Sequence, residues 1–350
     1  MISSAKFCTV LRGSVAEGNS KTTMEELARL AGVSVSTVSR ALNDAPLISP
    51  RTKQRIWALA REHHYPFRQS MAPAPIGAEG SIAIVTPYVM GRPLPLSHPF
   101  FLELIAGIGE AARARDCDFT VSHVAASTYD DLIRATTTSR ANGVIFLGQS
   151  GLHQDFNRLA RTGAKFVVWG AQFADQLYRS IGSDNLAGGK RATSHLLRLG
   201  RRRIAFLGGH DPEAQQRRRG YIEAHAEIGL TADPALMAQV EFEYESAEAA
   251  IGAMLAAGLK LDGVFASSDL MALGAVRALR QAGLRVPADV SIVGYDDMLL
   301  ARLSWPALTT IRQDTFEAGR LLVSSILDPG GSSRSGLIAT ELIVRESCGA

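Results

Sequence analysis

The 350-residue chain has few cysteines and no long apolar run. Its three cysteines, Cys8, Cys117 and Cys348, are odd in number and far apart in sequence, which argues against a disulfide framework and favours a reducing compartment. There is no stretch of about 18 apolar residues, the length that a membrane-spanning helix requires. The N-terminus also lacks the basic start, apolar centre and small-residue cleavage site of an export signal. We therefore expect a cytoplasmic protein that does not associate with membranes.

Enzyme signatures are equally scarce. Gly107, Gly109 and Ala112 match the spacing G-x-G-x-x-A, but they fall within a predicted helix rather than in the strand-to-helix turn that cradles a phosphate. His63 and His64 are adjacent, so one helix face cannot present both rings to a metal ion. The chain contains no nucleophile elbow of the G-x-S-x-G kind. The sequence thus predicts no catalysis, no metal site and no cofactor.

Positive charge, by contrast, is concentrated near the N-terminus. Residues 1–70 contain ten Lys and Arg against five Asp and Glu, whereas residues 71–350 contain 27 against 29. The overall charge of +3 is therefore the sum of +5 on the first segment and −2 on the remainder. Affinity for a phosphate backbone needs positive charge gathered in this way. The N-terminal segment is thus a candidate nucleic-acid interface.

A short helix is predicted to begin after Thr23 in this basic segment. Thr23 and Glu26 have the spacing of a capping box, in which the side chain of each accepts a hydrogen bond from the backbone amide of the other. Gly32 follows where a left-handed residue ends a helix at low cost. The apolar side of the helix is formed by Leu27, Ala28, Leu30 and Ala31.

A second helix follows at once, from about Val35 to Asn43, with Ser34 as its cap. The small side chains of Ala28, Ala31 and Val38 suit a close crossing of the two helices. This pattern predicts a helix-turn-helix, with a short outer face that suits a DNA major groove. The residues expected on that face are Val35, Ser36, Thr37, Ser39 and Arg40. The alternative is an ordinary helical hairpin with polar residues in solvent, and the charge distribution counts against it.

A third amphipathic helix is predicted from Ser49 to His64. Ile56, Leu59 and Ala60 would pack on the first two helices, with Trp57 nearby. Its basic side chains would remain solvated or meet phosphate; these are Arg51, Lys53, Arg55 and Arg61.

Residues 81–345 alternate short β-branched runs with helical stretches, which predicts parallel sheets covered by helices on both faces. Helices are expected at 99–115, 185–199 and 269–282. This segment is longer than one such sheet with its helices needs. The strand and helix pattern is interrupted near 172–181, which indicates two lobes. Strands are expected at 81–86, 119–124, 143–148, 166–170, 203–208, 263–267 and 290–295.

The segment from Thr23 to Asn43 reads T-x-x-x-L-A-x-x-A-G-V-S-x-x-T-V-S-R-x-L-N without a gap. It resembles the DNA-binding signature of the lactose/galactose repressor family of bacterial transcription regulators. The resemblance implies a small all-α helix-turn-helix head and an α/β body of two Rossmann-like lobes, similar to periplasmic sugar-binding proteins. The chain would cross between the lobes three times, near 176–181, 306–312 and 330–337.

The domain boundaries follow from this resemblance. We expect a disordered N-terminal extension over residues 1–21, a helix-turn-helix domain over 22–65 and a hinge over 66–80. The N-terminal lobe would comprise 81–177 and 310–330, and the C-terminal lobe 178–309 and 331–348.

The resemblance also assigns roles in the head, residue by residue. Positions matching Val35, Ser36 and Arg40 face base edges in the family. Arg40 would contribute the largest discrimination, roughly 1–3 kcal/mol if it is bidentate to guanine. Phosphate contacts are implied for Thr23, Ser34, Thr37, Ser39 and Asn43.

The hinge departs from the family pattern Y-x-P-N-x-x-A-R-x-L, which folds on operator DNA and wedges a leucine into the minor groove. Here the chain reads Tyr65-Pro66-Phe67-Arg68-Gln69-Ser70-Met71, followed by APAPIG. The spacing of Tyr and Pro is off by one, and the Asn is missing. Three prolines argue against a long hinge helix. We assign Tyr65 and Met71 to the hinge, with Met71 as a candidate wedge.

A ligand cleft has candidates at the ends of predicted strands, where open parallel sheets place binding sites. Asp296 and Ser268 each follow a strand, and Arg217 lies in the segment after another. These groups can bind vicinal hydroxyls while an aromatic ring stacks on the apolar face of a sugar. The aromatic candidates are Phe100, Phe101 and Trp169. Asp269 is expected to cap the helix that follows it.

The resemblance points to Arg217 and Asp296 as effector contacts and places Phe100 and Phe101 at a position that often lines the cleft. A monosaccharide or disaccharide suits this polar pair better than a purine, which would prefer more stacking. The combined expectation is a homodimeric, sequence-specific regulator, a repressor rather than an activator, that binds a pseudo-palindromic DNA operator under control of a small ligand. An exported solute-binding protein and a sugar-modifying enzyme remain as alternatives, but neither accounts for the head.

Overall fold

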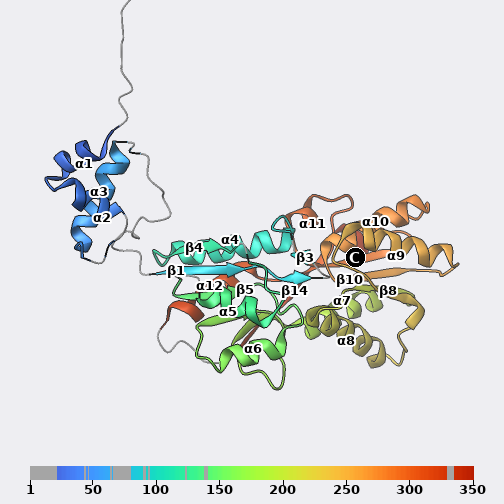
Figure 1. The fold of residues 1–350 in the computed structure, drawn as a ribbon. Coiled ribbons are helices and arrows are strands. Elements are labelled where there is room, and N and C mark those ends of the chain that lie inside the picture. Colours follow the sequence, from blue (N-terminus) through green and yellow to red (C-terminus); the bar gives the residue numbers. More distant parts are fainter. Residues whose placement is uncertain are drawn as a thin grey trace, which may run out of the picture. The chain divides into compact units, whose positions relative to one another are not determined.

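The computed structural model of this chain describes residues 22–42, 45, 47–63, 65, 80–89, 92–93, 95–122, 124–137, 141–328 and 335–350. The chain divides into two compact units, residues 1–78 and 79–350, which we call the head and the body (Figure 1). The expected extension over 1–21 lies outside the described residues. So does the expected hinge, including Met71, apart from Gly80.

The described residues of the head form three helices, α1 (Met24–Ala31), α2 (Val35–Leu42) and α3 (Pro50–Glu62). The hydroxyl of Thr23 accepts a hydrogen bond from the backbone amide of Glu26 at 3.3 Å, and Gly32 ends α1 with φ 64°. The hydroxyl of Ser34 accepts from the backbone amide of Thr37 at 3.2 Å and caps α2. These contacts satisfy amides that a helix start leaves unpaired. They confirm the predicted helix-turn-helix.

The carboxylate that meets Thr23 belongs to Glu25, one residue before the predicted partner. Hydrogen bonds from the backbone of Glu25 and from the Thr23 hydroxyl lower the pKa of Glu25. An acidic group at this place also interacts favourably with the positive end of the helix dipole.

One buried cluster holds the three helices of the head together. The Nε1 atom of Trp57 donates to the backbone oxygen of Ala41 at 3.2 Å, which ties α3 to α2. Small alanines at the crossings allow the helices to approach closely. The buried members of the cluster are Leu27, Ala28, Ala31, Val38, Ala41, Leu42, Ile56, Trp57 and Ala60.

The body contains two six-stranded sheets, which confirms the predicted two-lobed α/β class. Lobe 1 has the strand order β13-β7-β6-β5-β1-β4, with parallel neighbours throughout. These strands are β1 (Ser81–Val85), β4 (Asp118–Val121), β5 (Gly143–Phe146), β6 (Phe166–Trp169), β7 (Ser180–Ser183) and β13 (Gly336–Ile338).

Lobe 2 has the order β14-β12-β11-β10-β8-β9, in which only β14 runs antiparallel to its neighbour. Its strands are β8 (Ile204–Gly208), β9 (Met237–Gln239), β10 (Gly263–Ala266), β11 (Ser291–Asp296), β12 (Thr309–Arg312) and β14 (Glu341–Ile343). A separate two-stranded ribbon of β2 (Tyr88–Val89) and β3 (Arg92–Pro93) lies in the first half of the body sequence.

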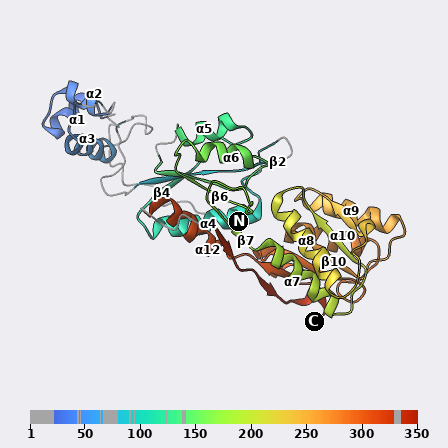
Figure 2. The ribbon, with the colours of Figure 1, turned by 90° about the horizontal axis from the view of Figure 1, so that it is seen from below.

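Helices cover both faces of each sheet (Figures 1 and 2). In lobe 1 they are α4 (Pro99–Arg113) and α12 (Thr315–Leu327) on one face, and α5 (Tyr129–Thr137) and α6 (His153–Ala160) on the other. In lobe 2, α9 (Tyr244–Ala256) and α10 (Asp269–Gln281) lie opposite α7 (Asn185–Arg198) and α8 (Pro212–Glu227). The short helix α11 (Leu299–Leu303) follows β11.

The chain passes between the lobes three times, as expected, but each crossing falls later than predicted. The crossings lie between β7 and α7, between β12 and α12, and between β13 and β14. The predicted boundaries at 177/178, 309/310 and 330/331 were therefore wrong by several residues. The reason is that β7, β12 and β13 each complete a sheet before the chain leaves it. Their sequences, SIGS, TTIR and GLI, are too short or too polar to signal a strand.

The glycine pattern considered for dinucleotide binding has a packing role instead. Gly107 lies inside α4, and a Cβ there would stand 2.3 Å from the backbone oxygen of Thr315. A Cβ on Gly319 in α12 would stand 2.2 Å from the backbone of Gly107. The two glycines therefore permit α4 and α12 to cross in close contact.

Candidate functional site

The outer side of α2 carries the side chains expected to meet bases. Val35 is 39% exposed despite being apolar, and Ser36 and Arg40 are exposed as well. Thr37 and Ser39 are half-buried, and Asn43 lies outside the described residues. An exposed valine on a helix otherwise short of surface apolar groups suits contact with a thymine methyl group.

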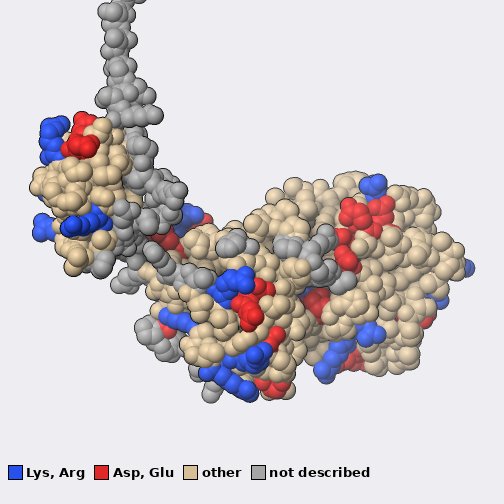
Figure 3. Space-filling view, viewed as in Figure 1, with Lys and Arg blue, Asp and Glu red and all other residues tan. Residues whose placement is uncertain are grey.

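Hydroxyl groups gather at the start of α2. The Ser34 hydroxyl lies 2.9 Å from the Ser36 hydroxyl and 2.8 Å from the Thr37 hydroxyl. Ser34 and Ser36 are exposed, and so is Thr23 at the start of α1. Helix starts that present backbone amides and hydroxyls are suited to phosphate oxygens. Figure 3 shows Lys and Arg side chains at several places on the visible face of the head.

Tyr65, the last residue of the predicted helix-turn-helix domain and also assigned to the hinge, packs with the three helices. Its backbone amide donates to the oxygen of Ala60 at 2.8 Å, and its side chain packs against the buried cluster of the head. The hydrogen bond closes the C-terminal end of α3, which is why this tyrosine is held there.

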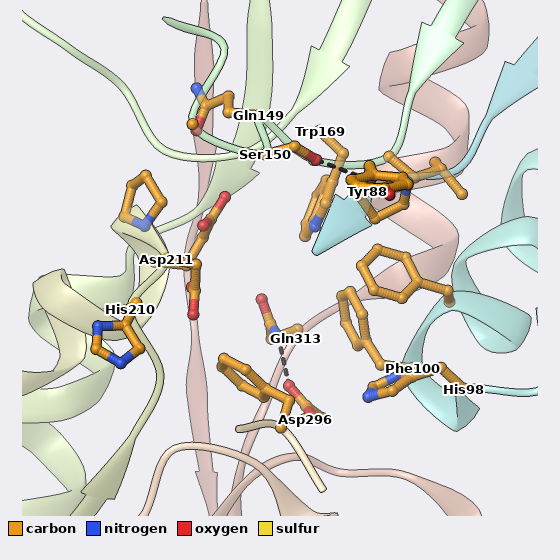
Figure 4. Close-up of a pocket in the computed structure, with 18 of the residues that line it drawn as sticks. Tyr88, His98, Phe100, Gln149, Ser150, Trp169, His210, Asp211, Asp296 and Gln313 are labelled. Carbon is orange, nitrogen blue, oxygen red and sulfur yellow. Dashed lines mark hydrogen bonds between the residues drawn. The ribbon is translucent and has the colours of Figure 1, made fainter. Parts of the chain in front are cut away.

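A cavity of about 440 Å³ lies between the two lobes of the body (Figure 4). Its size falls in the range of small-molecule sites. Lobe 1 and the ribbon supply one wall, and the starts of α8 and the ends of β11 and β12 supply the other. The lining residues are Pro87, Tyr88, His98, Phe100, Phe101, Leu147, Gly148, Gln149, Ser150, Gly151, Trp169, His210, Asp211, Pro212, Glu213, Arg217, Phe242, Asp296 and Gln313.

The lobe 1 wall is largely aromatic, and all three predicted aromatic residues line it. Phe100 lies with its ring centroid 6.0 Å from that of Trp169 and 5.3 Å from that of Phe101. Phe100 and Trp169 are also buried in the core of lobe 1, so their positions are fixed by packing. Such a rigid apolar surface can stack on one face of a sugar ring.

Arg217 on α8 is buried and held on three sides. Its Nε donates to Oδ1 of Asn185 at 2.8 Å, its Nη1 donates to the backbone oxygen of Ser267, and its guanidinium lies 3.7 Å over the ring of Tyr295. These contacts orient the planar group toward the cavity and leave fewer donors for a ligand. The structure thus places Arg217 in the cavity wall, where the sequence predicted it.

Asp296 ends β11 and lines the cavity with only 5% of its surface exposed. Its Oδ1 accepts from Nε2 of Gln313 at 2.6 Å. Burial raises the pKa of Asp296 to about 7, against the effect of nearby Arg217. Its φ of 114° is a strained conformation for a residue with a Cβ, and such strain costs about 1–3 kcal/mol and clusters at functional sites.

Ser268, predicted as an effector contact, has a different role. It is 1% exposed, does not line the cavity, and its hydroxyl accepts from the backbone amide of Met271 at 3.2 Å. Ser268 is therefore the cap of α10, the role predicted for Asp269. The carboxylate of Asp269 instead accepts from the Thr310 hydroxyl at 2.6 Å and from the Met298 amide at 2.9 Å. This buried carboxylate thus connects β12 to the segment that follows β11.

Several polar residues of the cavity were missed by sequence reasoning. Asp211 caps α8, accepting from the amide of Ala214 at 2.9 Å, and Glu213 follows in the first turn. Gln149 and Gln313 come from different lobes. The signal available was that Gln149 directly follows the strand predicted at 143–148 and Gln313 directly follows β12, because strand ends meet at one edge of the sheet.

The fold and the cavity define a two-domain regulator, with a helix-turn-helix head joined to a two-lobed ligand-binding body. Family models agree: the N-terminal segment matches "Bacterial regulatory proteins, lacI family" over residues 23–66, and the body matches "Periplasmic binding protein-like domain" over residues 193–348.

Relatives of nearly full length support the same assignment. The chain is 31% identical over 343 residues to the HTH-type transcriptional regulator CelR of Thermobifida fusca, covering 95% of this chain and 99% of CelR. It is 32% identical to the HTH-type transcriptional repressor CytR of Escherichia coli, covering 93% and 96%. The chain therefore belongs to the lacI family of bacterial transcription regulators.

Solved structures are similar over the same length. A CelR–cellobiose complex matches with a TM-score of 0.66 and 31% identity, covering 93% of this chain and 99% of that one. A lac repressor dimer bound to operator and the anti-inducer ONPF matches with a TM-score of 0.72 and 26% identity, covering 94% and 99%. Within the part of the chain that the structure describes, no helix is long and apolar enough to cross a membrane.

Proposed function

We propose that this regulator is a repressor that binds a pseudo-palindromic operator as a homodimer and is controlled by a small carbohydrate in the cavity between its lobes. The observation that carries the proposal is that one chain joins a helix-turn-helix head to a cavity walled by both lobes. Relatives with the same organisation include the CelR–cellobiose complex and the lac repressor dimer on its operator.

In the head, we assign base contacts to Val35, Ser36 and Arg40. Their exposure on one short helix supports this assignment. Phosphate contacts are assigned to Thr23, Ser34, Thr37, Ser39 and Asn43. Two heads related by a two-fold axis would read two half-sites, which explains why a dimer requires a symmetric operator.

In the body, we assign effector contacts to Arg217 and Asp296, with Phe100, Phe101 and Trp169 as the stacking surface. A fixed guanidinium and a carboxyl group opposite aromatic rings suit a carbohydrate, because hydroxyls need paired donors and acceptors while the ring face is apolar. A purine remains the second candidate, since the same wall contains several aromatic rings. A carbohydrate is favoured because its several hydroxyl groups can donate to all three carboxyl groups of the lining, whereas a purine has fewer N–H donors.

Control of DNA binding requires that the ligand prefer one arrangement of the lobes. Only such a difference in affinity can shift the equilibrium between arrangements. The chain crosses between the lobes three times, so a change in their angle is constrained to a hinge motion. In a dimer, that motion would alter the spacing of the two heads.

The test uses the full chain and two readouts. Selection from a randomised duplex library should yield an inverted repeat, and its affinity should fall steeply with salt because phosphate contacts release counterions. A carbohydrate that raises the melting temperature should also change this affinity, and Asp296→Ala should abolish both ligand effects. A salt-insensitive interaction, or identical ligand responses from wild type and variant, would overturn the proposal.

The same experiments separate the other classes. A deletion of residues 1–78 should remove DNA binding entirely and leave ligand binding intact. A solute-binding protein would bind sugar but no specific duplex. We further propose that the bound carbohydrate is released unchanged, and mass analysis after prolonged incubation would reveal turnover by a sugar-modifying enzyme.

A further inference from the structure

Glu213, at the start of α8 in lobe 2, makes a direct contact with lobe 1 across the cavity. Its Oε1 accepts from the backbone amide of Ala171, which follows β6, at 3.1 Å. Gly170 leaves room beside this contact, since a Cβ there would stand 3.0 Å from Oε1 of Glu213. The carboxyl group therefore touches both lobes and the space where a ligand would lie.

A second acceptor converges on the same amide. Oε1 of Gln149 also accepts from the Ala171 amide at 3.1 Å. The orientation of Gln149 is fixed, because its Nε2 donates to the oxygen of Ala171 at 2.6 Å and lies 3.0 Å from the Tyr178 hydroxyl. Two acceptor oxygens thus share one donor. A further hydrogen-bond donor at this place, on the carboxyl group itself or on a ligand, would relieve the conflict.

Acidic groups also outnumber basic groups around the cavity. Three carboxyl groups line it, from Asp211, Glu213 and Asp296, against the single guanidinium of Arg217. Two donors of that guanidinium already serve Asn185 and Ser267. No lysine is among the described lining residues.

The titratable groups that face Glu213 explain its protonation. Partial removal from water, and then the carboxylate of Asp211, raise the pKa of Glu213 to about 8, while Arg217 on the same helix lowers it. From lobe 1, Tyr178 faces it, with its own pKa raised by burial. At pH 7 the carboxyl group is therefore largely protonated, because its surroundings disfavour a negative charge at this place, and it becomes an anion only above about pH 8.

We propose that Glu213 determines the charge class of the effector: it accepts a carbohydrate whose nearest group is a hydroxyl or an ammonium and rejects one with a carboxylate or phosphate there. The inference rests on the proposed function, because it assumes a carbohydrate in this cavity. An anionic group there would meet the carboxyl groups of Asp211 and Glu213. The one guanidinium among the described lining residues, that of Arg217, already gives two of its donors to Asn185 and Ser267, and a desolvated, poorly paired charge is costly. An ammonium would find carboxyl oxygens and aromatic faces together.

The experiment compares matched ligands that differ only in charge. Glucose, glucosamine and glucuronate form one series, and galactose, galactosamine and galacturonate a second; binding to the full chain is measured by calorimetry at pH 7 and at pH 9, below and above the pKa of Glu213. Within the series that binds, we expect the uronate to bind at least tenfold more weakly than the neutral sugar at pH 9, where Glu213 is ionised, and we expect a smaller difference at pH 7. Glu213→Gln should reduce the difference at pH 9 at least fivefold. Glu227→Gln, a surface substitution on the same helix, should leave it unchanged.

The outcomes are distinguishable. Equal or tighter binding of the uronate by wild type, or unchanged discrimination in Glu213→Gln, overturns the role of Glu213 while the carbohydrate effector stands. If operator binding is intact but no sugar binds, the carbohydrate effector is overturned and this inference with it. Carbon NMR of labelled glutamate supplies a readout without ligand: the signal missing from Glu213→Gln should titrate above pH 6, and titration below pH 6 would contradict the proposal.

Discussion

The Nε2 atom of Gln313 donates to Oδ1 of Asp296 over 2.6 Å, inside the cavity wall. Gln313 directly follows β12, in the second segment that crosses between the lobes. Asp296 ends β11 in a strained backbone conformation. One buried hydrogen bond therefore joins a group available to a ligand to a segment that must bend when the lobes move (Figure 4).

We predict that Gln313→Ala uncouples these two elements. Removal of the amide leaves a buried carboxyl group without its partner, which typically costs about 1–3 kcal/mol. Effector affinity should fall about tenfold, and the effector should change operator affinity less than in wild type. Calorimetry and fluorescence anisotropy measure the two effects. Gln281→Ala removes an amide that pairs with Glu248 at the surface of lobe 2, and the prediction fails if both variants behave alike.

Arg217→Lys should impair the site although charge is conserved. A lysine cannot donate to Asn185 and to the Ser267 backbone in the same planar geometry, nor lie flat over Tyr295. We expect at least a tenfold loss of effector affinity and a lower melting temperature, because Asn185 loses a buried partner. Arg219→Lys on the same helix, which pairs with Glu223 at the surface, should preserve both. Wild-type affinity in Arg217→Lys would show that the guanidinium does not bind the effector.

The stability that Asp296 and Glu213 contribute should fall as pH rises from about 5 to about 8. Burial raises the pKa of Asp296 to about 7 and that of Glu213 to about 8. The folded protein therefore keeps protons that the unfolded chain has already lost above its ordinary carboxyl pKa, and each deprotonation favours unfolding. The double variant Asp296→Asn, Glu213→Gln should flatten the profile of melting temperature against pH.

A control for this profile is Asp289→Asn. Hydrogen bonds from Arg285 lower the pKa of Asp289 to about 2, so its contribution is already complete at pH 5 and is lost only in acid. Its substitution should shift the whole curve between pH 5 and 8 without changing the slope. An unchanged slope in the double variant would refute the assignment of the two raised pKa values.

The head was predictable from sequence because its signals are local. Caps at Thr23 and Ser34, the stop at Gly32 and the apolar stripes all act within one or two helical turns. Longer buried strands were found for the same reason, since four consecutive apolar residues are visible without knowledge of neighbours. The strands β7, β12, β13 and β14 escaped because they gain their stability from the sheets they complete.

The cavity was predictable only in part. Arg217, Asp296 and the aromatic residues were placed by resemblance and by the rule that ligands bind at strand ends. The contacts between the two lobes could not be predicted, because they join residues that are far apart in sequence. The roles of Glu213, Gln149 and Gln313 depend on these contacts. Ser268 was misassigned because a residue after a strand serves equally well as a cap for the next helix.

Arg40→Ala should reduce operator discrimination, not just affinity. If the guanidinium is bidentate to a guanine, its loss removes roughly 1–3 kcal/mol of preference for that base. The ratio of affinities for the operator and for a scrambled duplex should fall at least fivefold. Arg55→Ala removes the same charge from α3, and it should weaken binding to both duplexes equally. Equal effects of the two substitutions on the ratio would mean that Arg40 contacts only phosphate.

The homodimer should depend on an exposed apolar surface at α11. Leu299 and Leu303, one helical turn apart, are 54% and 71% exposed, and Trp305 next to them is 74% exposed. Apolar side chains gathered in this way mark interaction sites, and aromatic residues often dominate their energetics. Leu303→Asp with Trp305→Ser should yield monomers in analytical ultracentrifugation and weaken operator binding at least tenfold, because each head then binds one half-site. Leu177→Asp changes an equally exposed leucine of lobe 1 and should remain dimeric, whereas an intact dimer in the double variant would place the interface elsewhere.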